Sequence, residues 1–77
     1  MKVGDLVRYR EHMRHTYGYK EYMDVTWKII EDNTGNQYPP LCISDARGYK
    51  VFYESPLELK KATKAQRLEY MLEVLKS

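Results

Sequence analysis

The most constraining feature of this sequence is a strict alternation around Trp27, where Val25, Trp27 and Ile29 occupy every second position. Successive side chains of a β-strand point to opposite faces, so a two-residue period of β-branched and aromatic residues predicts a half-buried strand. The same period returns around Val51, in residues 49–54. Both stretches are too short for a helix of ordinary length, and the sequence therefore favours a fold built from short strands.

Turn-forming residues divide the rest of residues 1–60 into further short strands. Pro39 and Pro40 lack a backbone N–H, so they mark the start or an exposed edge of their strand. Ile30 breaks the alternation, which indicates either a β-bulge or burial on both faces at that point. Residues 11–21 lose the alternation and are predicted to form a long loop. In the fourth strand, Tyr49, Val51 and Tyr53 share one side. We expect strands at residues 7–10, 24–30, 38–44, 49–54 and 57–59.

After Thr63 the period of the apolar residues changes from two to about 3.6. Thr63 is suited to cap a helix, and Gln66 stands three residues later, as in a capping box. These signals predict a helix over about residues 64–76. Its apolar stripe must pack on the chain's own strands or on a partner. The stripe consists of Leu68, Met71, Leu72 and Leu75.

A chain of 77 residues supports one hydrophobic core, so residues 1–77 are predicted to form a single domain. Within it, residues 1–60 would form a small five-stranded barrel and residues 63–77 would add the C-terminal helix. The fold class predicted is therefore mainly β with one α-helix.

Charge and cysteine content narrow the classes of function. The net charge is +2, divided as +3 over residues 1–20, −4 over residues 21–58 and +3 over residues 59–77, which differs from a uniformly cationic nucleic-acid binder. Cys42 is the single cysteine, so no disulfide framework is expected. Without a secretory signal or a stretch long enough to span a membrane, we expect a protein that is neither secreted nor membrane-bound and that works in a reducing cytoplasm.

No residue pattern predicts catalysis. Cys42 has no base near it in sequence, Ser44 lacks the strained turn of a serine nucleophile, and no Gly-rich phosphate loop occurs. His12 and His15 have no evident third metal ligand. We therefore expect a protein that is not an enzyme and that needs no cofactor and no metal.

Basic and aromatic side chains are interleaved in the first loop, where they could contact phosphates and bases or a protein surface. A third interpretation is a solvated loop whose tyrosines fold back onto the barrel. All three stay open at this point. The candidate partner-binding residues are Arg8, Arg10, Arg14, Tyr17, Tyr19, Lys20 and Tyr22 of the loop region, with Leu68, Met71 and Leu75 of the helix.

Several segments together resemble the small barrel proteins of the Src-homology-3-like (SH3-like) kind that tailed bacteriophages encode. The segments are Val3–Arg8, Val25–Thr26, Ile29–Asp32, Pro40–Leu41 and Ser55–Leu59. The resemblance implies an SH3-like barrel, no shared catalytic residue, and a role as a minor virion or assembly component that binds itself or other virion proteins. It places the chain in the host cytoplasm or the virion. The alternative is a small-barrel regulator that binds nucleic acid or the host transcription machinery.

Overall fold

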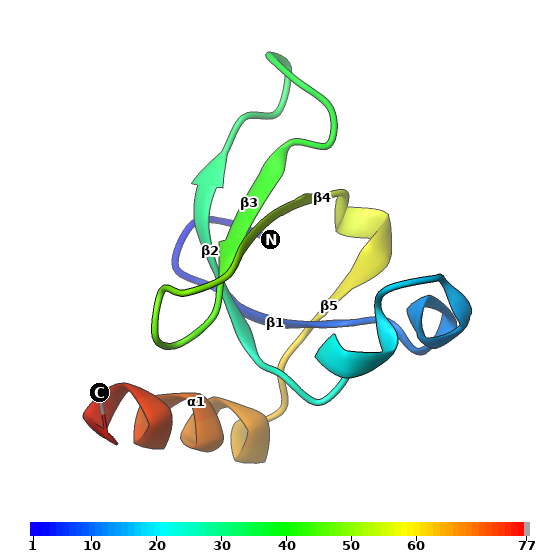
Figure 1. Cartoon of the computed structure of the whole chain (residues 1–77). Coiled ribbons are helices and arrows are strands. Elements are labelled where there is room, and N and C mark those ends of the chain that lie inside the picture. The colour runs from blue at the N-terminus through cyan, green and yellow to red at the C-terminus, as the bar shows by residue number, and fades with distance from the viewer. Residues whose placement is uncertain (77) are drawn as a thin grey trace.

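The computed structural model describes residues 1–76, in which five antiparallel strands form one sheet and an α-helix follows them (Figure 1). Three short 3-10 helices lie in the connections. The strands are β1 (Leu6–Tyr9), β2 (Trp27–Asp32), β3 (Leu41–Ser44), β4 (Val51–Glu54) and β5 (Leu59–Lys61). The helices are η1 (Glu11–His15), η2 (Lys20–Tyr22), η3 (Pro56–Glu58) and α1 (Lys64–Lys76).

The strand order across the sheet is β4-β3-β2-β1-β5. Strands β4 and β5 are the two edges, and η3 carries the chain from one edge to the other. The sheet curls strongly, so that β4 passes in front of β2 and β3 in Figure 1. The predicted mainly β class, with five strands and one C-terminal helix, is confirmed.

Strand β2 begins at Trp27, later than the predicted start at residue 24. The N–H of Val25 still donates to the carbonyl of Tyr22 at 3.3 Å, so the turn after η2 continues up to that point. The pairing of β2 with β3 shifts register between Ile29 and Glu31, which places the predicted bulge at Ile30. The bulge leaves Ile30 exposed while Ile29 stays in the core.

Strand β3 begins at Leu41, so the predicted start at residue 38 was wrong. Tyr38 and the two prolines precede the strand, because Pro39 and Pro40 have no N–H to donate to the sheet. The Tyr38–Pro39 peptide bond is cis. Before the strand, the N–H of Asn33 donates to the carbonyl of Pro40 at 2.9 Å and closes the β2–β3 connection. After it, Gly48 adopts a φ of 74° in the turn to β4, a conformation that glycine reaches without strain.

Val51 and Tyr53 share one face of β4, as the alternation predicts, and the structure shows that this face is the outer one. Ile43 of β3 is fully buried and pairs with Phe52, so Phe52 and the following Glu54 at the same parity point inward. Val51 and Tyr53 lie on the outer face and are about half exposed, and Tyr49, which precedes the strand, is exposed as well. The apolar side of this segment therefore faces solvent.

The prediction of a last strand at residues 57–59 was wrong for its first two residues. Pro56, Leu57 and Glu58 form η3, because Pro56 presets the helical backbone and the Ser55 hydroxyl accepts a hydrogen bond from the Leu57 N–H at 3.2 Å. Strand β5 starts at Leu59 and pairs with β1.

The core lies inside the curled sheet and under the first loop. Trp27 is completely buried and contacts three aromatic rings, those of Tyr9, Tyr22 and Phe52, with ring centroids 5.4–6.0 Å apart. Such edge-to-face contacts add to the stabilisation from burial. The other buried members of the core are Val7, Met13, Met23, Ile29, Leu41, Ile43 and Leu59.

Helix α1 begins as predicted. The Thr63 hydroxyl accepts a hydrogen bond from the Gln66 N–H at 3.2 Å, and the Gln66 side chain accepts one from the Thr63 N–H at 2.9 Å. This reciprocal pair is a capping box. The helix lies against one end of the sheet (Figure 1), and none of its residues is buried.

Candidate interaction surface

Helix α1 is attached to the sheet by polar contacts. The Arg8 guanidinium donates to the Thr26 hydroxyl and to the Glu69 carboxylate, both at 3.0 Å. Further along, Arg47 in the β3–β4 turn donates to Glu73 at 3.1 Å. Between these two ion pairs Tyr70 is half-buried. One side of α1 thus holds the helix to the sheet through two arginines and one tyrosine.

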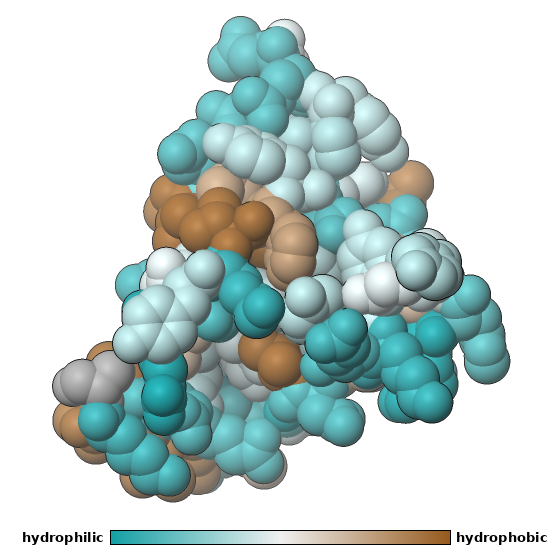
Figure 2. Space-filling model, in the orientation of Figure 1, coloured by the Kyte–Doolittle hydropathy of each residue, from teal (hydrophilic) through white to brown (hydrophobic). Residues whose placement is uncertain are grey.

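The opposite side of α1 carries the apolar stripe. Leu68, Met71, Leu72 and Leu75 follow the spacing i, i+3, i+4, i+7 that places side chains on one helix face. Their exposed fractions run from 51% for Leu68 to 80% for Leu75. Figure 2 shows apolar atoms along the lower edge of the molecule, on the side of α1 away from the sheet. These four residues are called the α1 stripe, and each of them is more than half exposed.

Two grooves run along α1, one on each flank of Tyr70. The first has a volume of about 510 Å³ and includes both arginine–glutamate pairs together with Asp24, Asp45 and Lys76, so it carries charges of both signs. The second has a volume of about 470 Å³ and is mostly apolar. This second one is called the Tyr70 groove, and it is lined by Lys28, Ala46, Tyr70, Met71, Val74 and Leu75.

Three cations border the α1 stripe and the Tyr70 groove. Lys64 lies one helical turn before Leu68, Arg67 lies one turn before Met71, and Lys28 lines the groove itself. All three are exposed, and within residues 1–76 none forms an ion pair with a carboxylate, although the Arg67 guanidinium donates to the Ala62 carbonyl at 2.9 Å. These three residues are called the basic rim. The outward side of α1 therefore combines apolar side chains with positive charge.

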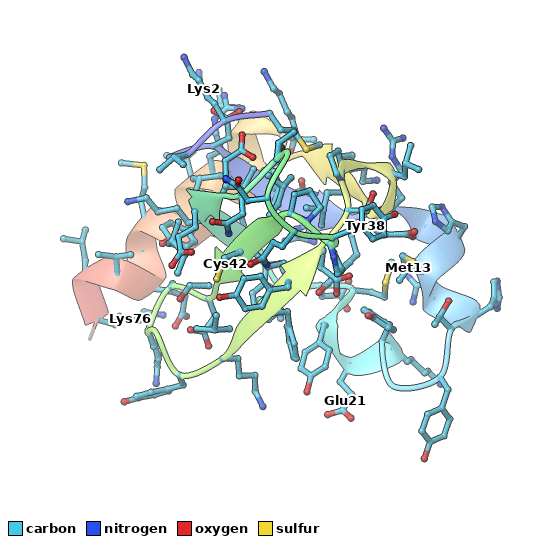
Figure 3. The ribbon with its side chains drawn as sticks, turned by 90° about the horizontal axis from the view of Figure 1, so that it is seen from above. Lys2, Met13, Glu21, Tyr38, Cys42 and Lys76 are labelled. Atoms are coloured by element: carbon cyan, nitrogen blue, oxygen red, sulfur yellow. The ribbon has the colours of Figure 1, made fainter. Side chains whose placement is uncertain are left out.

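The first loop is more ordered than predicted, because it contains η1 and η2. Its two central tyrosines fold back onto the sheet. The ring of Tyr19 packs edge-on against Tyr9 at 5.2 Å, and Tyr22 contacts Phe52 at 5.2 Å. Met13 of η1 also points toward the sheet, whereas Glu21 points away from it (Figure 3). The loop is thus held by aromatic packing.

A buried carboxylate fixes this arrangement. Glu54 of β4 is 6% exposed and accepts hydrogen bonds from the hydroxyls of Tyr9 at 2.7 Å and Tyr19 at 3.0 Å. Burial raises the pKa of the Tyr9 hydroxyl above its usual range, and the hydrogen bond to Glu54 raises it further. The pKa of Tyr19 is raised by the same two causes. This contact joins three distant segments, and sequence reasoning missed Glu54 because its two hydrogen-bond donors lie 45 and 35 residues away in the chain.

The basic residues of the loop region do not gather into one surface. The Arg8 side chain is engaged with Thr26 and Glu69, and Arg14 pairs with Glu11 at 2.5 Å. Three of the predicted residues remain exposed without an ion pair in the described chain. They are Arg10, Tyr17 and Lys20. Figures 1 and 3 place η1 and the C-terminal end of α1 at opposite ends of the molecule, so the loop and helix candidates form two separate surfaces.

The remaining reactive groups do not converge. His12 contacts the Glu58 carboxylate at 2.8 Å. Cys42 is buried, and that burial raises the pKa of its thiol, so the reactive thiolate is disfavoured. Across residues 1–76, His, Cys, Asp and Glu side chains form no group of three or more that could hold a metal ion.

No protein-family model matches the chain, and neither the curated proteins nor the solved structures contain a significant match. Within residues 1–76, no helix has the length and apolarity needed to cross a lipid bilayer.

Proposed function

We propose that this chain is a non-catalytic protein-interaction module that docks a partner on the α1 stripe. The observation that carries the proposal is the orientation of α1. Its polar side, through Glu69 and Glu73, is tied to the sheet, while four large apolar side chains at helical spacing face solvent. Contiguous apolar surface of this kind typically marks a site of protein interaction.

The energetics agree with this role. Full burial of a leucine or methionine side chain stabilises an assembly by about 1.5–3 kcal/mol. The side chains of the α1 stripe are 51–80% exposed, so a partner that buries them would gain much of that stabilisation on binding. A helix face presented in this way is a common mode of recognition, in which anchors at i, i+3, i+4 and i+7 enter a hydrophobic groove.

Binding of nucleic acid is less well supported by the geometry. A phosphate-binding surface needs free cations close together, but Arg8 and Arg14 are both engaged with carboxylates. We therefore place protein binding first. Binding of oligonucleotides that strengthens steeply as salt is lowered, and that is lost in an Arg10→Ala, Lys20→Ala variant, would favour the regulator instead.

As to biological role, we propose a minor component of a bacteriophage virion or of its assembly, present in the host cytoplasm or in the particle. The support is the sequence resemblance of residues 3–60 to small phage-encoded barrels. Mass spectrometry of purified particles tests this role. Detection in particles supports it, whereas presence in infected cells and absence from particles would favour the regulator.

The docking surface is tested by capture of proteins from infected-cell lysate on the immobilised chain. We expect Leu75→Glu to abolish capture, because it places a charge in the α1 stripe. Leu57→Glu is the matched control, since Leu57 is also an exposed leucine, at 73%, but lies on η3. Equal capture by the wild type and both variants, each shown to be folded by thermal unfolding, would contradict the proposed surface.

A further inference from the structure

We propose that the partner segment bound by the α1 stripe is an acidic amphipathic helix of another protein. This inference rests on the proposed function and goes further by naming the partner's chemistry. Two features carry it: the shape of the Tyr70 groove beside the stripe, and the sign of the charge around both.

The shape favours a helix as the bound segment. The α1 helix has 13 residues, which makes it about 20 Å long, and the stripe extends over two turns of that length. Met71 and Leu75 belong to both the stripe and the Tyr70 groove. A partner helix lying along α1 can therefore pack one row of side chains on the stripe and insert another into the groove.

The charge favours acidic flanks on that helix. The two glutamates of α1 are paired with Arg8 and Arg47 on the side of the sheet. The outward side is left with the basic rim, whose three cations have no carboxylate partner in the described chain. An apolar surface edged by cations without carboxylate partners selects a partner with Asp or Glu beside its apolar anchors, because complementary charge favours the right partner and like charge excludes others.

One orientation of a second copy is disfavoured by the same charges. Lys64 lies one turn before Leu68 on the apolar side of α1. Parallel pairing of two α1 helices along the stripe would therefore set Lys64 of one copy against Lys64 of the other, and like charges at such a seam are destabilising.

The experiment is a selection on the intact, immobilised chain. The probe is a display library of amphipathic helical peptides whose apolar positions are fixed as leucine and whose flanking positions are Glu or Lys in equal numbers. We expect Glu-flanked peptides to be enriched at least about tenfold over Lys-flanked ones. We expect a Lys64→Glu, Arg67→Glu variant to reverse that preference, while Lys20→Glu, an exposed lysine of η2, leaves it unchanged.

Other outcomes overturn the inference in distinguishable ways. One such outcome is equal enrichment of Glu-flanked and Lys-flanked peptides, with the enrichment lost in Met71→Glu. That result would support the docking surface but contradict the preference for an acidic partner. Failure to enrich any peptide would overturn the helical partner, while lysate capture decides the proposed function separately. A dimer in analytical ultracentrifugation that Leu75→Glu dissociates would make a second copy the occupant. Stronger binding to phosphatidylglycerol vesicles than to any selected peptide would identify a membrane surface as the occupant of the α1 stripe.

Discussion

The sheet and helix α1 are held in place by different forces. In the sheet, Trp27, Ile29 and Ile43 are fully buried and each strand pairs with a neighbour. In α1 no residue is buried, and the helix is attached through the ion pairs of Arg8 and Arg47. Ion pairs with a solvent-exposed partner contribute about 0–1 kcal/mol each, far less than burial of a large side chain. The difference separates a part that stabilises the fold from a part that presents a surface.

The largest expected loss of stability comes from truncating a buried side chain of the sheet. Ile43→Ala removes a fully buried side chain from the central strand β3 and should lower the free energy of unfolding by about 2–5 kcal/mol. Leu75→Ala, at an 80% exposed position of α1, should change it by less than about 0.5 kcal/mol. Urea unfolding of both variants measures this contrast, and equal losses would show that α1 packs like a core element.

A smaller effect is expected where the first loop meets the sheet. Glu54→Leu leaves the buried Tyr9 hydroxyl without its acceptor and should cost about 1–3 kcal/mol. The loss should be accompanied by faster proteolysis of the loop around η1 and η2, because Tyr19 is released with it. Tyr17→Phe, at a fully exposed tyrosine of the same loop, is the control. Unchanged proteolysis in Glu54→Leu would contradict the role of this carboxylate.

The same contact predicts a dependence of stability on alkaline pH. The pKa of Tyr9 is raised in the folded state, so its contribution is fully present below the unfolded value of about 10 and is lost as pH rises above that value. Between pH 10 and 11 the unfolded chain releases this proton and the folded chain keeps it, which lowers the free energy of unfolding by about 1 kcal/mol. Below pH 10 the urea midpoint of the wild type should differ from that of Tyr9→Phe. As the pH rises above 10, the two midpoints should approach each other.

The smallest effect should appear in the attachment of α1. Arg8→Met removes the contacts to Thr26 and Glu69 and should destabilise the chain by up to about 1 kcal/mol. Hydrogen exchange should nevertheless change in a selective way, with faster exchange of α1 amides and little change in β2 and β3. Arg10→Met, an exposed arginine next to the same strand, is the control. Equal acceleration in sheet and helix would show that the two regions open together.

Local features of the fold were predictable from the sequence. The Thr63–Gln66 capping box, the prolines before β3 and the bulge at Ile30 each depend on residues a few positions apart. The displaced start of β5 could in principle have been foreseen too, because Ser55 and Pro56 together favour a helical turn. These features follow from backbone propensity and from hydrogen bonds within a short segment.

Local patterns do not determine which face of β4 is buried or where the tyrosines of the first loop pack. Alternation shows that Val51 and Tyr53 share a side, but pairing of Phe52 with the buried Ile43 decides which side faces inward. Likewise Glu54 is buried because Tyr9 and Tyr19, 45 and 35 residues away, donate to its carboxylate. Both outcomes depend on contacts between distant segments.

For α1, the capping residues and the 3.6-residue period already predict a helix with an apolar stripe, since both are local properties of the chain. Which side of that helix meets the sheet depends on contacts with distant segments. Arg8 and Arg47 come from β1 and the β3–β4 turn, and they bind the glutamates of α1 and turn Leu68 and Leu75 toward solvent. The direction of an amphipathic helix depends on what surrounds it, and those surroundings exist only once the chain is folded.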